Sequence, residues 1–324
     1  FVGAAIHMAR KLRTTRKFLA SIDLTETLVN ADRKTDLLLR ERLADGSVRL
    51  LRCSWLSSPE ADAHLGRHLP SGAAIMRRRQ DLPSEAFFSP HEAAALLDRG
   101  DRSVLALSYR WLTGLHPEPL GTTLTAVRRY LRDEPSSDAC GLFWDFASLP
   151  QKDENGSRTD EEYEIFSRGL KVMALMYASL TGTAVLQLKA IPDCPDEFDG
   201  CVTLYGKGAK QTPTQDALEA ERLVLCAQLQ RIGEVTSVRL PFVTERDASV
   251  QVTFASHEKA EHAVAAFNGD SNARFGWELT FTTAGLTYNT TAYDRKQGSV
   301  YSGWCTFEHG VSMMAAAHLA TAQQ

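Results

Sequence analysis

Hydrophobic and polar positions alternate most clearly between residues 200 and 286. In the segment 248–254, Val250, Val252 and Phe254 share one face of a predicted strand. The helical spacing of apolar residues that follows ends at Asn268-Gly269, which is a helix stop signal. A second helical pattern lies at 223–232. Three more strand patterns lie at 201–205, 235–240 and 277–281. The order β-α-β-β-α-β predicts an α+β unit of ferredoxin-like topology.

The regions on either side of this unit show the pattern of a parallel α/β sheet. Short apolar runs alternate with segments of helical periodicity. The apolar runs lie at 104–111, 140–146 and 184–188, and the helical segments lie at 122–131 and 160–177. Such alternation predicts parallel strands with helices on both faces. The inner face of the second helix is predicted to carry Tyr163, Phe166, Leu170, Met173 and Met176. Ligands of such sheets bind beyond the carboxyl ends of the strands, where this chain has Arg110, Asp145 and Gln151.

The first hundred residues are expected to form an extension of helices and a hairpin. Asp45-Gly46 between two apolar segments predicts a hairpin turn. Ser89-Pro90 is typical of a helix start, and this helix is expected to run to Asp98. The basic segment 1–22 is interpreted as a solvated helix face, with an organelle transit peptide as the alternative. The predicted division is an extension (1–100), an α/β domain in two parts (101–197 and 287–324) and an insert (198–286).

The six elements of the insert resemble an RNA-recognition motif (RRM), a fold that stacks RNA bases on aromatic side chains of its central strands. Tyr205 stands where this family places its first stacking ring. Ser249 and Gln251 stand in place of the other two rings. The resemblance implies single-stranded RNA as a ligand, with contacts from Tyr205, Lys207, Arg239 and Gln251.

The charge of the insert bears on this interpretation. Residues 198–286 contain eleven Asp and Glu against eight Lys and Arg, a net charge of −3. Phosphate binding needs local positive charge, and each base stacked on an aromatic ring contributes roughly 1–3 kcal/mol. We therefore expect RNA binding by this insert to be weak. A protein partner, or self-association of the chain, is the alternative use of the same fold.

Short motifs in the flanking regions resemble TIR domains and the related HET (heterokaryon incompatibility) domains. Leu107-Ser-Tyr-Arg-Trp111 is similar to the end of the first TIR strand. Phe143-Trp-Asp145 followed by Gln151, and then Met173-Ala-Leu-Met-Tyr177, resemble HET motifs. Tyr301-Ser-Gly-Trp-Cys-Thr-Phe-Glu308 is similar to the Trp-Cys-x-x-Glu helix of many TIR domains. The resemblance implies a TIR/flavodoxin-like parallel sheet that is interrupted by the RRM-like insert.

In NAD-cleaving TIR domains the glutamate of that helix is catalytic, so the resemblance implies this role for Glu308. A carboxylate there would stabilise the oxocarbenium-like charge that develops on NAD(P), which enters as a substrate and not as a cofactor. Its place near the start of a helix favours an ionised Glu308. A purely structural carboxylate, exposed or paired with Arg110, is the alternative. The implied nucleotide contacts are Ser108, Arg110, Asp145, Gln151 and Trp304.

Composition favours an ordinary intracellular protein, cytoplasmic or nuclear. The hydrophobic content of 44% and the charged content of 23% are globular values. The six cysteines and nine histidines show no metal-ligand spacing, which predicts neither a metal site nor a disulfide framework. No run reaches the ~18 apolar residues of a membrane span. Two functions remain open: a regulatory or recognition protein with a binding insert, and an NAD(P) nucleosidase that works through Glu308.

Overall fold

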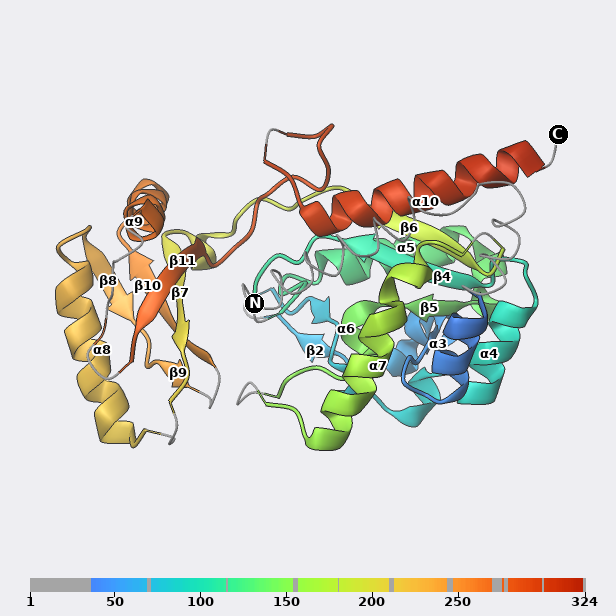
Figure 1. Ribbon diagram of the computed structural model, residues 1–324, viewed down its shortest axis with the longest axis horizontal. Coiled ribbons are helices and arrows are strands. Elements are labelled where there is room, and N and C mark those ends of the chain that lie inside the picture. Colours follow the sequence, from blue (N-terminus) through green and yellow to red (C-terminus); the bar gives the residue numbers. More distant parts are fainter. Residues whose placement is uncertain are drawn as a thin grey trace.

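The protein is a mixed α/β chain with one sheet that contains parallel strands and one antiparallel sheet. The computed structural model describes residues 36–68, 71–114, 116–153, 157–179, 181–209, 213–243, 247–269, 276, 279–298 and 300–322. The basic segment 1–22 and the predicted strand start at Trp277 lie outside the described residues. Figure 1 shows the two sheets in two separate bodies that are joined by two extended segments.

The first sheet has the strand order β1-β5-β4-β6 among the described residues. It comprises β1 (Leu51–Arg52), β5 (Gly141–Phe143), β4 (Val104–Tyr109) and β6 (Thr183–Leu188). The last three strands are parallel, as predicted, but β1 pairs with β5 in the antiparallel direction. The strand predicted at 140–146 is shorter than expected, because a short helix, α6 (Asp145–Ser148), begins at its end.

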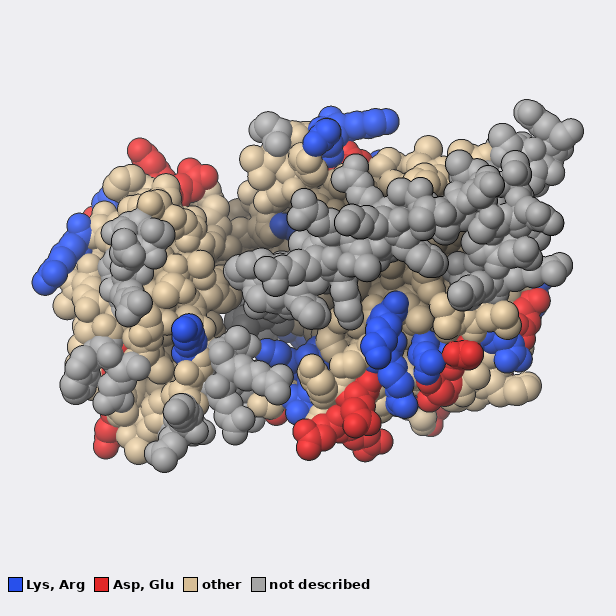
Figure 2. All heavy atoms as spheres, viewed as in Figure 1, with Lys and Arg blue, Asp and Glu red and all other residues tan. Residues whose placement is uncertain are grey.

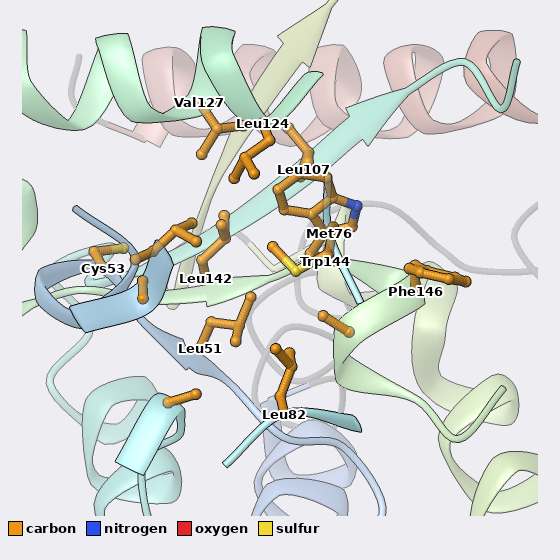
Figure 3. Packing of buried hydrophobic residues seen from close by; sticks show 14 of the residues in the cluster. Leu51, Cys53, Met76, Leu82, Leu107, Leu124, Val127, Leu142, Trp144 and Phe146 are labelled. Atoms are coloured by element: carbon orange, nitrogen blue, oxygen red, sulfur yellow. The ribbon is translucent and has the colours of Figure 1, made fainter. Parts of the chain in front are cut away.

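One face of this sheet is covered by α3 (Cys53–Ser57) and α5 (Thr122–Asp133). Leu105 and Leu107 of β4 point to this side, where they pack with Leu124 and Val127 of α5. Figure 3 shows this cluster, with the buried Trp144 beside Met76. The periodicity of α5 predicted from the sequence is confirmed.

The other face is covered by the helix at 36–44, by α4 (Pro90–Asp98), by α7 (Asp160–Met176) and by α10 (Gly303–Ala322). Val104 and Ala106 of β4 point to this side, because successive strand residues alternate between faces. The helix start at Ser89-Pro90 is confirmed, since the Ser89 side chain accepts from the Glu92 backbone N–H in a capping box.

Two predictions for these helices are wrong. The segment before Asp45-Gly46 is a helix and not a hairpin strand, and Gly46 (φ +72°) instead forms the turn that ends it. Tyr163 was expected on the inner face of α7, but it is 52% exposed. It lies in the first turn of α7, which extends beyond the sheet in Figure 1. Shorter elements connect the rest: η1 (Pro59–Ala63), β2 (Gly66–Arg67), β3 (Ala74–Ile75), η2 (Arg79–Asp81), η3 (Ser84–Ala86), η4 (Pro135–Ala139) and η5 (Asp196–Phe198).

The insert contains every predicted element and one additional short strand. In chain order they are β7 (Cys201–Lys207), α8 (Gln215–Leu229), β8 (Val235–Val238), β9 (Phe242–Val243), β10 (Asp247–Phe254), α9 (His257–Gly269) and β11 (Phe281–Leu286). The sheet order is β11-β7-β10-β8, with antiparallel pairing throughout and β9 on β10. The last strand was predicted at 277–281 and is observed at 281–286, where it pairs with β7 along its length.

The two ends of the insert lie side by side. The Thr287 backbone N–H donates to the Cys201 carbonyl at 2.9 Å, and the rings of Phe198 and Tyr288 are 5.5 Å apart. The insert also has a hydrophobic cluster of its own, which includes Leu204, Phe267 and Phe281 and shares no residue with the two clusters of the first sheet.

Because its core is separate, the segment 198–286 should fold when it is expressed alone and should unfold in one cooperative thermal transition. Phe281 is fully buried, so Phe281→Ala should cost about 3–5 kcal/mol of its stability. Thr283→Ala, on the same strand but only partly buried, is the control and should cost much less. Calorimetry of the isolated segment measures both, and a scan without a transition would refute independent folding.

Candidate functional site

The carboxyl end of β4 meets the first turns of α10. The alternation of β4 places Ser108 on the same face as Ala106, below α10. Its hydroxyl donates to the Glu308 carboxylate and also contacts the Tyr293 hydroxyl. Glu308 is 2% exposed, and Ser108 and Tyr293 are fully buried. The structure therefore brings Ser108 and Glu308 into direct contact although they are 200 residues apart.

Burial controls the protonation of Glu308. Desolvation raises the pKa of this carboxyl to about 8, and the nearby Asp145 adds to the increase. Hydrogen bonds from Ser108, Tyr177 and Trp304 lower the pKa but do not offset the burial. The expectation that the helix start keeps Glu308 ionised is wrong, because desolvation outweighs the effect of the helix end at this depth.

Asp145 follows β5 and is held by its neighbours. The Tyr109 hydroxyl and the Trp111 indole N–H each donate to one of its carboxylate oxygens, both at 2.9 Å. The Phe146 backbone N–H donates to it at 2.7 Å. Desolvation by burial raises the pKa of Asp145 above its ordinary value. With both oxygens engaged, this carboxylate fixes the ends of β4 and β5.

Arg110 lies next to this network. Its Nη1 donates to the Ser302 hydroxyl at 3.2 Å, whereas its buried Nε has no hydrogen-bond partner among the described residues. Desolvation lowers the pKa of Arg110. The Cys305 thiol, one turn before Glu308, donates to the Tyr109 carbonyl at 3.4 Å, and burial raises its pKa to about 11. Arg110, the one cation among the predicted nucleotide contacts, therefore lies beside Cys305, one turn before Glu308.

The other two predicted contacts, Gln151 and Trp304, pack within the domain. Gln151 donates from its amide to the carbonyls of Asp145 (3.1 Å) and Leu149 (3.0 Å), and so it fastens the loop after α6. Trp304 is partly buried against the cluster of the second face, with its ring 5.5 Å from that of Phe307. Among the predicted residues, Ser108, Trp304 and Glu308 meet directly, and Asp145 is their neighbour.

The segment 287–302 covers this network. Tyr293 reaches Ser108 from it, and Asp294 forms an ion pair with Lys189 at 3.1 Å. In this arrangement a dinucleotide has no access to Glu308. Sequence patterns gave no indication of Tyr293, because the segment has no strand or helix periodicity. Tyr177 follows α7 directly and belongs to the segment 173–177 that resembles a HET motif, and its hydroxyl donates to the Leu107 carbonyl at 3.0 Å.

A second buried glutamate, Glu118, lies four residues before α5. Glu118 is fully buried and accepts from the backbone N–H groups of Met76 and Leu124. Desolvation raises the pKa of Glu118 to about 8. His116 beside it has a lowered pKa for the same reason. The sequence showed no pattern that distinguished Glu118 from surface glutamates.

The predicted RNA-binding residues share the outer face of the insert sheet. Tyr205 and Gln251 alternate with Leu204 and Val250, which point into the core under α8 and α9. Arg239 is exposed and lies opposite Gln251, to whose carbonyl its backbone N–H donates at 2.9 Å. Tyr205 is partly covered, because its hydroxyl lies 3.3 Å from the position that a Cβ at Gly114 would take. Lys207 is exposed at the end of β7.

Charge is unevenly distributed around these elements. Five of the eleven acids of the insert lie on its two helices: Asp216, Glu219, Glu221, Glu258 and Glu261. The outer sheet face has Lys207 and Arg239, with Asp247 opposite Lys207 in the strand register. Figure 2 shows acidic side chains over the start of α7, whereas the described Lys and Arg of the insert that are visible there are scattered. The charge pattern favours the sheet face over the helices as a site for an anion.

No protein-family model matches this chain, and a comparison with curated proteins finds no match. No group of three or more possible metal ligands lies together in the described part of the chain. None of the helices among the described residues is long and apolar enough to cross a membrane. The likeness to TIR, HET and RRM domains therefore rests on the motifs and the order of elements.

Proposed function

We propose that this protein is a regulatory or recognition protein in which a TIR/HET-like α/β domain carries an RRM-like binding module. The observation that carries the proposal is the outer face of the insert sheet. This face holds Tyr205, Arg239 and Gln251 together, while both helices of the insert pack on the opposite face. The ligand is single-stranded RNA, because the face is polar and the two helices, which carry five of the acids, lie on the opposite side of the sheet.

RNA binding by the full chain should be micromolar or weaker and should decrease steeply with salt, since few cations are available. Fluorescence anisotropy with a labelled 12-nucleotide RNA of random sequence measures it. Arg239→Gln should weaken binding and reduce the slope of log K against log salt by about 0.7. Arg231→Gln, at an exposed position two residues after α8, is the control and should change neither quantity. A tight complex that resists salt, or no complex at all, would exclude this use of the sheet and leave a protein partner or a second copy of the chain.

A second candidate is cleavage of the nicotinamide glycosidic bond of NAD(P). It is favoured by the neighbouring positions of Glu308, Trp304 and Asp145. Arg110 lies beside Cys305 in the same helix as Glu308, and its buried Nε has no hydrogen-bond partner in the described part of the chain. Glu308 would stabilise the oxocarbenium-like transition state, and Arg110 would pair with the pyrophosphate. The segment 287–302 must move before a dinucleotide enters. Release of nicotinamide by the purified chain is the direct test.

A further inference from the structure

Phe242 is an aromatic side chain on the open face of the insert sheet. The short strand β9 pairs with β10, with Val243 opposite Ala248 and Phe242 opposite Ser249. Val243 packs against the core of the insert, and Ala248 is buried there. Since neighbouring strand residues point to opposite faces, Phe242 points outward, and it is 37% exposed.

Phe242 and Tyr205 stand on either side of Ser249. Ser249 lies opposite Tyr205 on β7 as well as opposite Phe242 on β9. Residues paired in this way project from the same face, and each step between strands is about 4.8 Å. The two aromatic residues therefore stand about 10 Å apart at their backbones, with the small Ser249 side chain as the floor between them. This spacing accommodates one planar ring with an aromatic side chain on each side.

The next row of the sheet supplies polar groups. Gln251 lies opposite Thr203 on β7 and opposite Arg239 on the other side. Arg239 is exposed and, within the described part of the chain, makes no ion pair. Gln251 and Arg239 thus lie next to the two aromatic residues. The Gln251 amide can hydrogen-bond the edge of a base, and the Arg239 guanidinium can bind a phosphate.

The α/β domain lies against the Tyr205 end of the row that contains Tyr205, Ser249 and Phe242. The Tyr205 hydroxyl lies 3.3 Å from the position that a Cβ at Gly114 would take, and the Tyr205 ring lies 4.0 Å from the same position at Gly285 on β11, so the ring is supported on the side away from Ser249. A ligand therefore approaches over β9 and β10. The middle of the face is formed by Thr203, Ser249 and Gln251, which is too polar to suit an apolar protein surface.

We propose that Phe242 and Tyr205 form a slot over Ser249 that takes one unpaired base of single-stranded RNA, with Arg239 on an adjacent phosphate and Gln251 at the base edge. This inference rests on the proposed RNA-binding function and adds Phe242 to it. Phe242 replaces a ring that the RRM resemblance places on β10, where this chain has Ser249 and Gln251.

The test uses the full chain and the same labelled 12-nucleotide RNA of random sequence. Phe242→Ala and Phe242→Leu should both weaken binding by about 10-fold, because stacking on one ring is lost. Phe242→Leu keeps an apolar side chain, so it guards against loss of folding. Phe242→Trp should bind as well as the original chain or better. Leu223→Ala, which removes a 57% exposed apolar side chain from α8, should have no effect.

The outcomes separate the two levels of the proposal. If the original chain binds RNA and Phe242→Leu binds equally well, the slot is refuted while RNA binding stands. If Phe242→Trp binds as poorly as Phe242→Leu, the side chain has a structural role and the slot is refuted as well. If the original chain shows no RNA binding at about 100 µM, the RNA-binding function itself is refuted.

Discussion

Raising the pH from 6.5 to 8.5 should lower the free energy of unfolding of this protein by about 4 kcal/mol, about 2 kcal/mol for each of two buried glutamates. Burial raises the pKa of Glu308 and of Glu118 to about 8. The unfolded chain releases these protons near pH 4.5, whereas the folded chain holds them to about pH 8. The stabilisation is therefore complete at low pH and is lost as the pH rises through 8.

Burial raises the pKa of Asp145 as well, so this carboxyl changes the stability in the same direction as the two glutamates. The lowered pKa of His116 changes the free energy of unfolding only below about pH 6.5. The lowered pKa of Glu92, about 2, changes it only below about pH 4.5. The raised pKa of the Cys305 thiol acts in the same direction as the glutamates and begins to matter only near the upper limit.

Urea unfolding at a series of pH values measures this dependence. Glu308→Gln removes one titrating group and keeps an acceptor for the Ser108 hydroxyl. It should reduce the slope of the free energy of unfolding against pH by about half. Glu161→Gln changes an exposed carboxylate at the start of α7 and should leave the slope unchanged. A stability that is constant or rises between pH 6.5 and 8.5 would show that Glu308 and Glu118 are ionised in the folded chain.

If the chain cleaves NAD, Glu308→Gln should reduce the turnover by at least ~10²-fold while nucleotide binding persists. The amide retains the size of the side chain but lacks the negative charge that would stabilise the oxocarbenium. Since burial raises the pKa of Glu308 to about 8 in the free chain, kcat/KM, which reports the free enzyme, should also rise with pH up to that value. Nicotinamide release measured by chromatography checks both statements.

Glu161→Gln is again the matched control and should keep the original rate. A Glu308→Gln chain that cleaves NAD at the original rate would eliminate the catalytic assignment. A rate that decreases between pH 6.5 and 8 would mean that a protonated group, and not the Glu308 carboxylate, limits the reaction. The pH that favours catalysis is also the pH that weakens the fold, so both measurements belong in the same buffers.

The sequence predicted the elements whose signals are local. α4 and α5 have the expected bounds to within two residues, because capping and apolar spacing act within one or two turns. The hairpin predicted at Asp45-Gly46 is wrong, because a glycine in the left-handed conformation can end a helix as well as join two strands. The last strand of the insert was displaced because its position depends on pairing with β7, and not on its own composition.

The candidate site was predictable only in part. Arg110 and Asp145 follow from the rule that strand ends gather at one edge of a parallel sheet. Tyr293 belongs to an irregular segment, and Glu118 resembles any other glutamate until the chain is folded around it. The partnership of Phe242 with Tyr205 depends on the register of three strands, which a single sequence does not specify.

The adjacent ends of the insert have a consequence for synthesis on the ribosome. Ser108 is made long before Glu308, with the whole insert between them. An unfolded connection of about 90 residues would add a loop-closure penalty to the docking of α10. A domain that folds as it emerges, with its ends side by side, shortens that connection to a few residues. The order of translation thus favours completion of the insert first and closure of the α/β domain last.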